Sequence, residues 1–207
     1  MGGGQAPFDV YSDFLRGMRG AMLDMYTQPD MLLEGCERQL KKTLERIELM
    51  PPPGENTRVF MALHRGADGF MSIPQFEKFY WPGLKQVIIA MVDKGYTPGV
   101  FFEGDYTSRL EYLLELPKGK VLAHLDTTDI YRAKDVLKDH MCIRGNVPAS
   151  LLQTGSVQDV EDYMKTLIDD IGKDGGLVVC PRSSPEKAKP ENMRAMIDFT
   201  KEYGVYN

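Results

Sequence analysis

The sequence predicts an α/β fold that forms part of a (β/α)₈ TIM barrel, and three observations lead to this prediction. Short apolar runs followed by helical patterns recur about five times from residue 58 onward, which indicates repeated βα units. Repeated βα units are typical of a parallel sheet. Polar residues directly follow the apolar runs, as in a barrel whose strand ends form the active-site face. Because about five strands cannot close such a barrel, we expect a partial barrel whose N-terminal strands are missing, or else an open sheet.

The expected strands are short and apolar, with little alternation of polar and apolar residues. Such strands are typical of a parallel sheet that is buried on both faces. We expect them to lie side by side in chain order, with the helices on the outer face. The predicted strands cover 59–63, 99–102, 121–125, 141–144 and 176–180, and the predicted helices cover 76–93 with an interruption near Trp81-Pro82, 108–115, 130–138, 157–171 with Ser156 as N-cap, and 190–203.

Residues 1–57 are expected to form an N-terminal helical segment of the barrel, and residues 58–207 its C-terminal part, within a single domain. Apolar residues recur at helical spacing over residues 8–50. The tripeptide Gln28-Pro29-Asp30 divides this stretch into two helices. The run from Pro51 to Gly54 ends it, because proline cannot continue a helix.

The composition is that of an ordinary globular protein, with 43% hydrophobic and 27% charged residues and a formal net charge of −5. No basic patch dominates, which argues against binding of nucleic acid. No apolar run reaches the length of a membrane span, so no membrane association is expected. The three cysteines are far apart in the sequence and form no CxxC pair, which favours reduced thiols and a cytoplasmic location.

Every predicted strand is followed by polar or ionisable residues, and these form the candidate site. A histidine titrates near neutral pH and suits acid–base catalysis, while guanidinium groups bind carboxylates and phosphates. The candidate catalytic residues are His64, Glu103 and Asp126, and the candidate substrate-binding residues are Arg65, Asp105, Arg144, Asn146 and Arg182.

Each of these assignments has a purely structural alternative. His64 could cap its strand by bonding a backbone carbonyl. Asp105 could close a turn by bonding the local backbone. The arginines could serve as partners for acidic residues within the site. His124 and His140 are expected to be structural.

A metal site is a further hypothesis. His64, Glu103 and Cys180 together would offer nitrogen, oxygen and sulfur ligands, all of which zinc accepts. The spacing is not diagnostic, because the three residues follow different strands. A hydrogen-bonded polar site without a metal is the favoured alternative, with Cys180 as a small buried side chain.

Three segments resemble motifs of the uroporphyrinogen decarboxylase superfamily, which includes cobalamin-dependent methyltransferases. The first, Ser72 to Pro82, is similar to the family's Ser-Pro helix opening. The second contains Gly145-Asn146-Val-Pro148 and Gly155, close to the family's Gly-Asn-x-Asp-Pro and Leu-x-x-Gly-Thr elements. The third runs from Gly175 to Met193 and resembles the closing Pro-Glu-Asn-x-x-Ala-Met. Together they cover residues 58–203, and the resemblance implies the C-terminal portion of that family's barrel.

The sequence also departs from the family's pattern. The methyltransferases hold zinc with a His-x-Cys pair and a later Cys, where this chain has Phe101-Phe102-Glu103 and Arg182. Arg182 also stands where the decarboxylase has a histidine, and the decarboxylase's arginine-rich N-terminal segment has no counterpart. The resemblance therefore implies a fold and a ligand class more strongly than a reaction.

The resemblance favours a corrinoid-linked methyltransferase or a fragment of one, acting with a small methyl donor and with cobalamin on a partner protein. One alternative is a uroporphyrinogen decarboxylase-type lyase, whose ligand is a tetrapyrrole. The other is a non-catalytic subunit that binds a tetrapyrrole or completes another barrel. Since a partial barrel leaves sheet edges and interior apolar residues uncovered, we expect a dimer or a complex with a complementary fragment.

Overall fold

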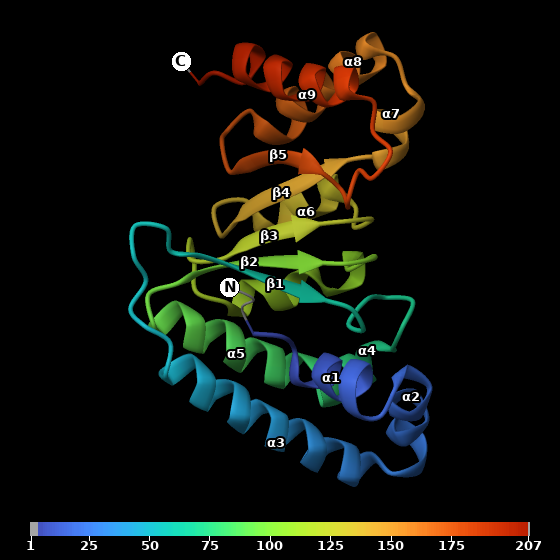
Figure 1. Cartoon of the computed structure of the whole chain (residues 1–207), viewed down its shortest axis with the longest axis vertical. Helices are drawn as coiled ribbons and strands as arrows, with labels where there is room; N and C mark the ends of the chain where they lie inside the picture. The colour runs from blue at the N-terminus through green and yellow to red at the C-terminus, as the bar shows by residue number, and fades with distance from the viewer. Residues whose placement is uncertain (1–3, 207) are drawn as a thin grey trace.

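The structure is a computed structural model that describes residues 4–206. Within this range five parallel strands form one sheet, in the order β1-β2-β3-β4-β5 (Figure 1). The predicted strands and their order are confirmed, with boundaries shifted by a few residues. The strands are β1 (Arg58–Leu63), β2 (Thr97–Phe102), β3 (Leu122–Leu125), β4 (Cys142–Val147) and β5 (Leu177–Pro181).

Helical segments follow the strands as a βα pattern requires. The first predicted helix begins earlier than expected, at Ile73, where Ser72 and Gln75 form a capping box. Its interruption before Pro82 is a π-helical turn and not a break. The segment expected as a helix over 108–115 is a 3₁₀-helix. The segments are α4 (Ile73–Gln75), η2 (Phe76–Tyr80), α5 (Trp81–Asp93), η3 (Thr107–Glu115), α6 (Ile130–Leu137), α7 (Ala149–Thr154), α8 (Val157–Leu167), η4 (Ile168–Gly172) and α9 (Pro190–Tyr203).

The N-terminal segment is helical, as predicted, but it contains one more break. Besides the break before Pro29, the chain turns at Gly17, whose φ of 76° suits glycine. Helices α1 and α3 pack against α5, beside β1 (Figure 1). The elements are α1 (Pro7–Val10), the π-helical turn η1 (Tyr11–Leu15), α2 (Met18–Thr27) and α3 (Pro29–Glu48).

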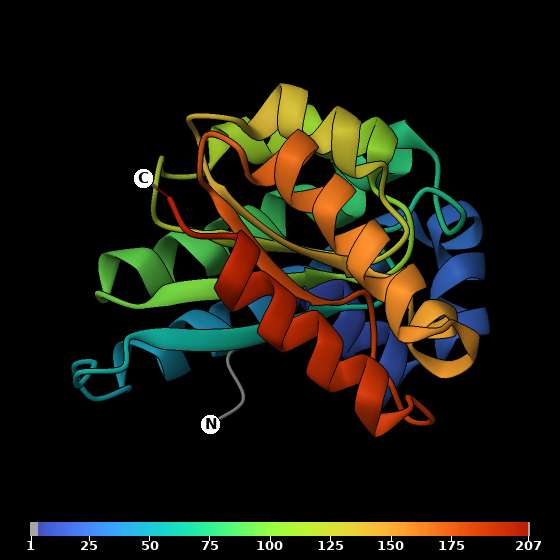
Figure 2. The ribbon, with the colours of Figure 1, turned by 90° about the horizontal axis from the view of Figure 1, so that it is seen from above.

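The two faces of the sheet differ in burial. One face packs under the helices, and Val100, Ala123 and Ile143 on it are buried. Viewed from above, α6 and α8 lie on the same side of the sheet, with α9 beside α8 (Figure 2). The other face turns toward the viewer in Figure 1, and no helix formed by residues 4–206 covers it. We call it the open face; by strand register it includes Phe60, Ala62, Phe101, His124, Arg144 and Val178.

The open face corrects the expectation that the strands are buried on both faces. Phe60 is 53% exposed and Val178 43% exposed, although both are apolar strand residues. The rings of Phe60 and Phe101 stack on one another with their centroids 6.4 Å apart. In a closed barrel this face would be the interior, and the strands opposite would cover it. The apolar strand residues are therefore explained by a barrel, in which one face of the sheet packs against the helices and the other faces the interior. Residues 4–206 provide the helices but not the strands that would cover the interior face.

The start of α8 allows a direct test of the local fold. Ser156 Oγ accepts a hydrogen bond from the Asp159 backbone N–H, and Asp159 Oδ2 accepts one from the Ser156 N–H. Ser156→Ala removes one half of this capping box and should lower the free energy of unfolding by about 1 kcal/mol. Chemical denaturation measures the change. The control Ser150→Ala alters an exposed serine in the first turn of α7, and equal losses in both variants would contradict the capping role.

Candidate functional site

All five strands end at one edge of the sheet (Figure 1), and most of the predicted site residues directly follow the strands there, whereas Arg144 and Asn146 lie within β4. The predicted site residues form two groups, one after β1 and β2 and the other around the ends of β3, β4 and β5. In the first group, His64 Nε2 lies 3.9 Å from Glu103 Oε2. Glu103 is exposed, whereas His64 is partly buried.

His64 is held by an aspartate from the N-terminal segment. Asp13, in η1, lies with its Oδ2 2.6 Å from His64 Nδ1, and its Oδ1 accepts a hydrogen bond of 2.9 Å from the Arg65 guanidinium. Burial raises the pKa of Asp13, but hydrogen bonds from His64 and Ser12 and the charge of Arg65 outweigh burial and hold that pKa below its usual value. An ionised Asp13 favours a proton on His64 Nδ1. The ring therefore bonds a carboxylate and not a backbone carbonyl.

A second aspartate of the same segment lies beneath this group. Asp9 is completely buried and accepts hydrogen bonds from the backbone N–H groups of His64 and Arg65, both at 3.0 Å, and from the Tyr80 hydroxyl at 2.8 Å. Burial raises the pKa of Asp9 to about 6, against the opposing effect of these hydrogen bonds.

Sequence reasoning missed Asp9 and Asp13. The available signal was their spacing, since residues four apart on a helix share one face. That spacing shows that two carboxylates lie together but not which strand end they contact.

Asp9 predicts a pH dependence of stability. A group whose folded pKa is raised contributes stability that is complete below its unfolded pKa, near 3.8, and is lost as the pH rises through about 6. Relative to Asp9→Asn, which cannot titrate, the wild-type protein should therefore lose about 3 kcal/mol of unfolding free energy between these pH values, since one pKa unit corresponds to ~1.4 kcal/mol. Denaturation of both proteins across this range measures the difference. A constant difference would contradict the assignment.

The second group surrounds Cys180. Its Sγ lies 3.3 Å from His124 Nε2 and accepts a hydrogen bond of 3.2 Å from Arg144 Nε. Burial raises the pKa of the Cys180 thiol, while Arg144 acts in the opposite direction. His124 Nε2 also lies 3.2 Å from the Pro181 carbonyl oxygen, a bond of the structural kind expected for this histidine.

The two remaining candidates in this group differ in their bonding. Asn146 is buried, and its Oδ1 accepts a hydrogen bond from the Tyr163 hydroxyl. The Arg182 Nε atom is buried and has no hydrogen-bond partner among residues 4–206. It is therefore a donor that a ligand could satisfy.

Two of the predicted acidic residues stabilise loops. Asp126 Oδ2 accepts a hydrogen bond from the Gly104 backbone N–H at 2.9 Å. Asp105 Oδ1 accepts hydrogen bonds from the backbone N–H and the hydroxyl of Thr107. Asp105 therefore closes a local turn, as its structural alternative predicted. Both contacts fix the loop after β2, which carries Glu103.

The structure does not bring together the three residues of the hypothesised metal site. Within the described part of the chain, no three His, Cys, Asp or Glu side chains are placed to hold one ion, so His64, Glu103 and Cys180 do not form a common site. The pair of His124 Nε2 and Cys180 Sγ, 3.3 Å apart, offers two of the donor types that zinc accepts, but no third such side chain joins it in the described part of the chain. The residues present therefore do not fit the zinc site that the resemblance implied.

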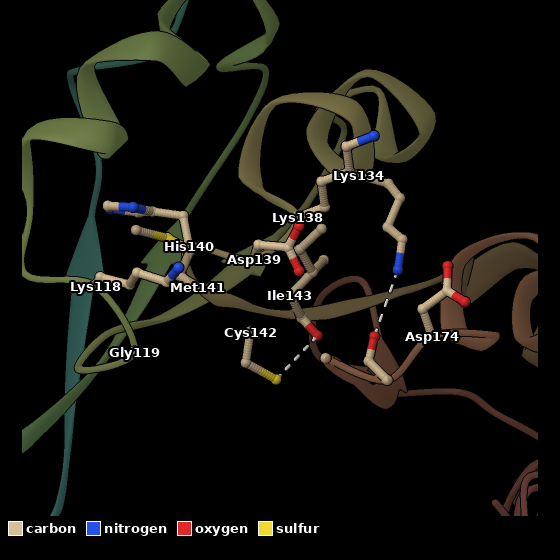
Figure 3. Close-up of a pocket in the computed structure, with 12 residues that line it drawn as sticks. Lys118, Gly119, Lys134, Lys138, Asp139, His140, Met141, Cys142, Ile143 and Asp174 are labelled. Carbon is tan, nitrogen blue, oxygen red and sulfur yellow. Dashed lines mark hydrogen bonds between the residues drawn. The ribbon is translucent and has the colours of Figure 1, made fainter.

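A cavity of about 550 Å³ lies near the beginning of β4, away from the strand ends (Figure 3). Lys118 and Lys134 line it from opposite sides, and Lys134 Nζ is directed to the Gly175 carbonyl oxygen. His140 also lines it, with Nε2 2.9 Å from the Leu116 carbonyl oxygen, a contact of the structural kind expected. Because the basic groups do not converge, the strand-end residues remain the candidate site.

Successive parallel βα units with polar residues at one sheet edge define part of a (β/α)-barrel protein. The family model for uroporphyrinogen decarboxylase (URO-D) matches residues 1–203, and the chain belongs to that family. Among solved structures, a methyltransferase from Methanosarcina mazei has the same fold, with a TM-score of 0.78 and 18% sequence identity. The match covers 99% of this chain and 58% of that one, so the chain spans little more than half of its structural relative.

No curated protein matches the sequence. Among residues 4–206, none of the helices combines the length and the apolar character that crossing a bilayer requires.

Proposed function

We propose that this chain is part or all of a methyl-transferring enzyme of the corrinoid-linked kind. The observation that carries the proposal is the Asp13–His64–Glu103 arrangement, which lies at the strand ends of a fold shared with a methyltransferase. In barrel enzymes this edge holds the reacting groups.

The chemistry proposed for these residues is proton transfer. With Nδ1 bonded to Asp13, the His64 ring presents Nε2 beside Glu103. When an acceptor thiol attacks the methyl group of a methylated corrinoid, its sulfur–hydrogen bond breaks and Nε2 takes up the released proton. The sulfur–carbon bond forms as the carbon–cobalt bond breaks, and the electron pair of the broken bond stays on cobalt. In this direction of transfer the methyl donor is a methylated corrinoid carried by a separate protein, in place of the small methyl donor that the resemblance favoured. No step is assigned to zinc, because the side chains present do not form its site.

Turnover of methylcobalamin with a thiol acceptor tests the proposal. The purified chain, together with any polypeptide that co-purifies with it, should consume methylcobalamin, and the change in corrinoid absorbance tracks the reaction. Uroporphyrinogen consumption under the same conditions would favour the decarboxylase alternative instead. That alternative needs guanidinium groups for substrate carboxylates, whereas Arg65 is paired with Asp13 and Arg144 bonds Cys180. Support for it comes from the Nε atoms of Arg65 and Arg182, which are buried and have no hydrogen-bond partner among residues 4–206.

A second candidate function is that of a subunit that completes a barrel without catalysing a reaction. The open face favours it, because Phe60 and Val178 are exposed and β1 and β5 are the edges of the described sheet. Absence of both activities, with stable binding to a second polypeptide, would support this candidate.

A further inference from the structure

The backbone after β1 is held in an unusual way. The strand ends at Leu63, and the next two backbone N–H groups, those of His64 and Arg65, donate to the two oxygens of one carboxylate, Asp9. Backbone groups just beyond a strand commonly face solvent. Here a completely buried side chain from the N-terminal segment, 55 residues away from His64 in the sequence, binds both.

The side chains of the same two residues are bound by the next carboxylate on the same helical segment. Asp13 contacts His64 Nδ1 at 2.6 Å and the Arg65 guanidinium at 2.9 Å. Asp9 thus holds the backbone of this dipeptide, and Asp13 holds its side chains. A shift of the backbone by about 1 Å would take the ring nitrogen out of hydrogen-bonding range of Asp13.

We propose that Asp9 is a positioning residue, which fixes the backbone of His64 and Arg65 so that the His64 ring meets Asp13 with Nδ1. The proposal rests on the proposed function for the importance of His64. The geometric part of the proposal is independent of the proposed function, because the orientation of the His64 ring can be observed without any activity.

The surroundings of Asp9 support this role. Besides the two backbone donors, the hydroxyl of Tyr80 in η2 binds Asp9 Oδ2 at 2.8 Å. Three donors on one buried carboxylate leave it little freedom to move. A purely structural anchor for α1 would not need to bind the two residues whose side chains Asp13 also binds.

Nitrogen NMR of the histidine rings tests the proposal, because the chain has three histidines and His64→Gln identifies the signals of His64. At mildly alkaline pH the wild-type His64 ring should carry its proton on Nδ1. Asp9→Ala should lose this pattern and show the proton on Nε2, as free histidine does. Asp24→Ala is the matched control: Asp24 is also buried and bonded within the N-terminal segment, to Arg16 and Tyr11, but it does not contact His64.

Loss of the Nδ1 pattern in Asp9→Ala and its retention in Asp24→Ala would establish the positioning role. A folded Asp9→Ala protein with an unchanged His64 spectrum would overturn it. If Asp9→Ala does not fold, amide hydrogen exchange in the wild-type protein decides. The His64 and Arg65 amides should then exchange as slowly as that of Leu63, and exchange as fast as the exposed Ser183 amide would overturn the proposal.

Discussion

His64→Gln should lower the rate of methyl transfer by about 10²- to 10⁴-fold, the usual contribution of a general acid or base. Glutamine can still hydrogen-bond Asp13 but cannot take up a proton at neutral pH. Because His64 is partly exposed and its ring contacts are with side chains, the fold should survive the change. Steady-state rates with methylcobalamin and a thiol measure the loss.

His140→Gln is the matched control. This histidine lies before β4, with Nε2 near a backbone carbonyl oxygen, far along the strands from their C-terminal ends. Its variant should keep the wild-type rate. Equal rates for His64→Gln and the wild-type protein would remove His64 from the reaction.

The chain should associate when it is purified alone, and the double variant Phe60→Glu/Val178→Glu should not. Both side chains are exposed on the open face, and apolar patches beside unpaired strand edges drive association. Light scattering distinguishes the two proteins, and circular dichroism verifies that the variant is folded.

Leu49→Glu is the control for this comparison, because Leu49 is 85% exposed at the end of α3 and does not belong to the open face. It should leave the association unchanged. A stable wild-type monomer that unfolds cooperatively would contradict the prediction.

The sheet was predictable because its signal is local. Each strand is an apolar run, each helix has its own periodicity, and right-handed crossovers then leave one simple order for the strands. The cap at Ser156 was predictable for the same reason, since the bonds join residues three apart. An uncovered barrel interior was expected from the number of strands, but the exposure of individual side chains on the open face depends on what lies opposite the sheet, which the sequence does not show.

The site was only partly predictable. The residues after the strands could be identified, because parallel strands bring their ends to one edge. Asp13 and Asp9 could not be connected to His64, because their contacts span more than 50 residues and depend on how α1 packs beside β1. The division of the candidates into two groups depends likewise on side-chain directions beyond the strand ends, which periodicity does not give.

The two π-helical turns make the site sensitive to chain length. Asp13 lies within η1, where the Arg16 N–H bonds the Tyr11 carbonyl oxygen, and Tyr80 is the last residue of η2. Deleting one residue from an α-helix rotates the downstream residues by about 100°, and deleting one from the wider π-helical turn also changes their direction. After a deletion between Asp9 and Asp13, the two carboxylates could no longer both contact His64 and Arg65. A deletion in η2 would turn the Tyr80 hydroxyl away from Asp9. In related sequences, insertions and deletions should therefore avoid both turns even where the individual residues vary.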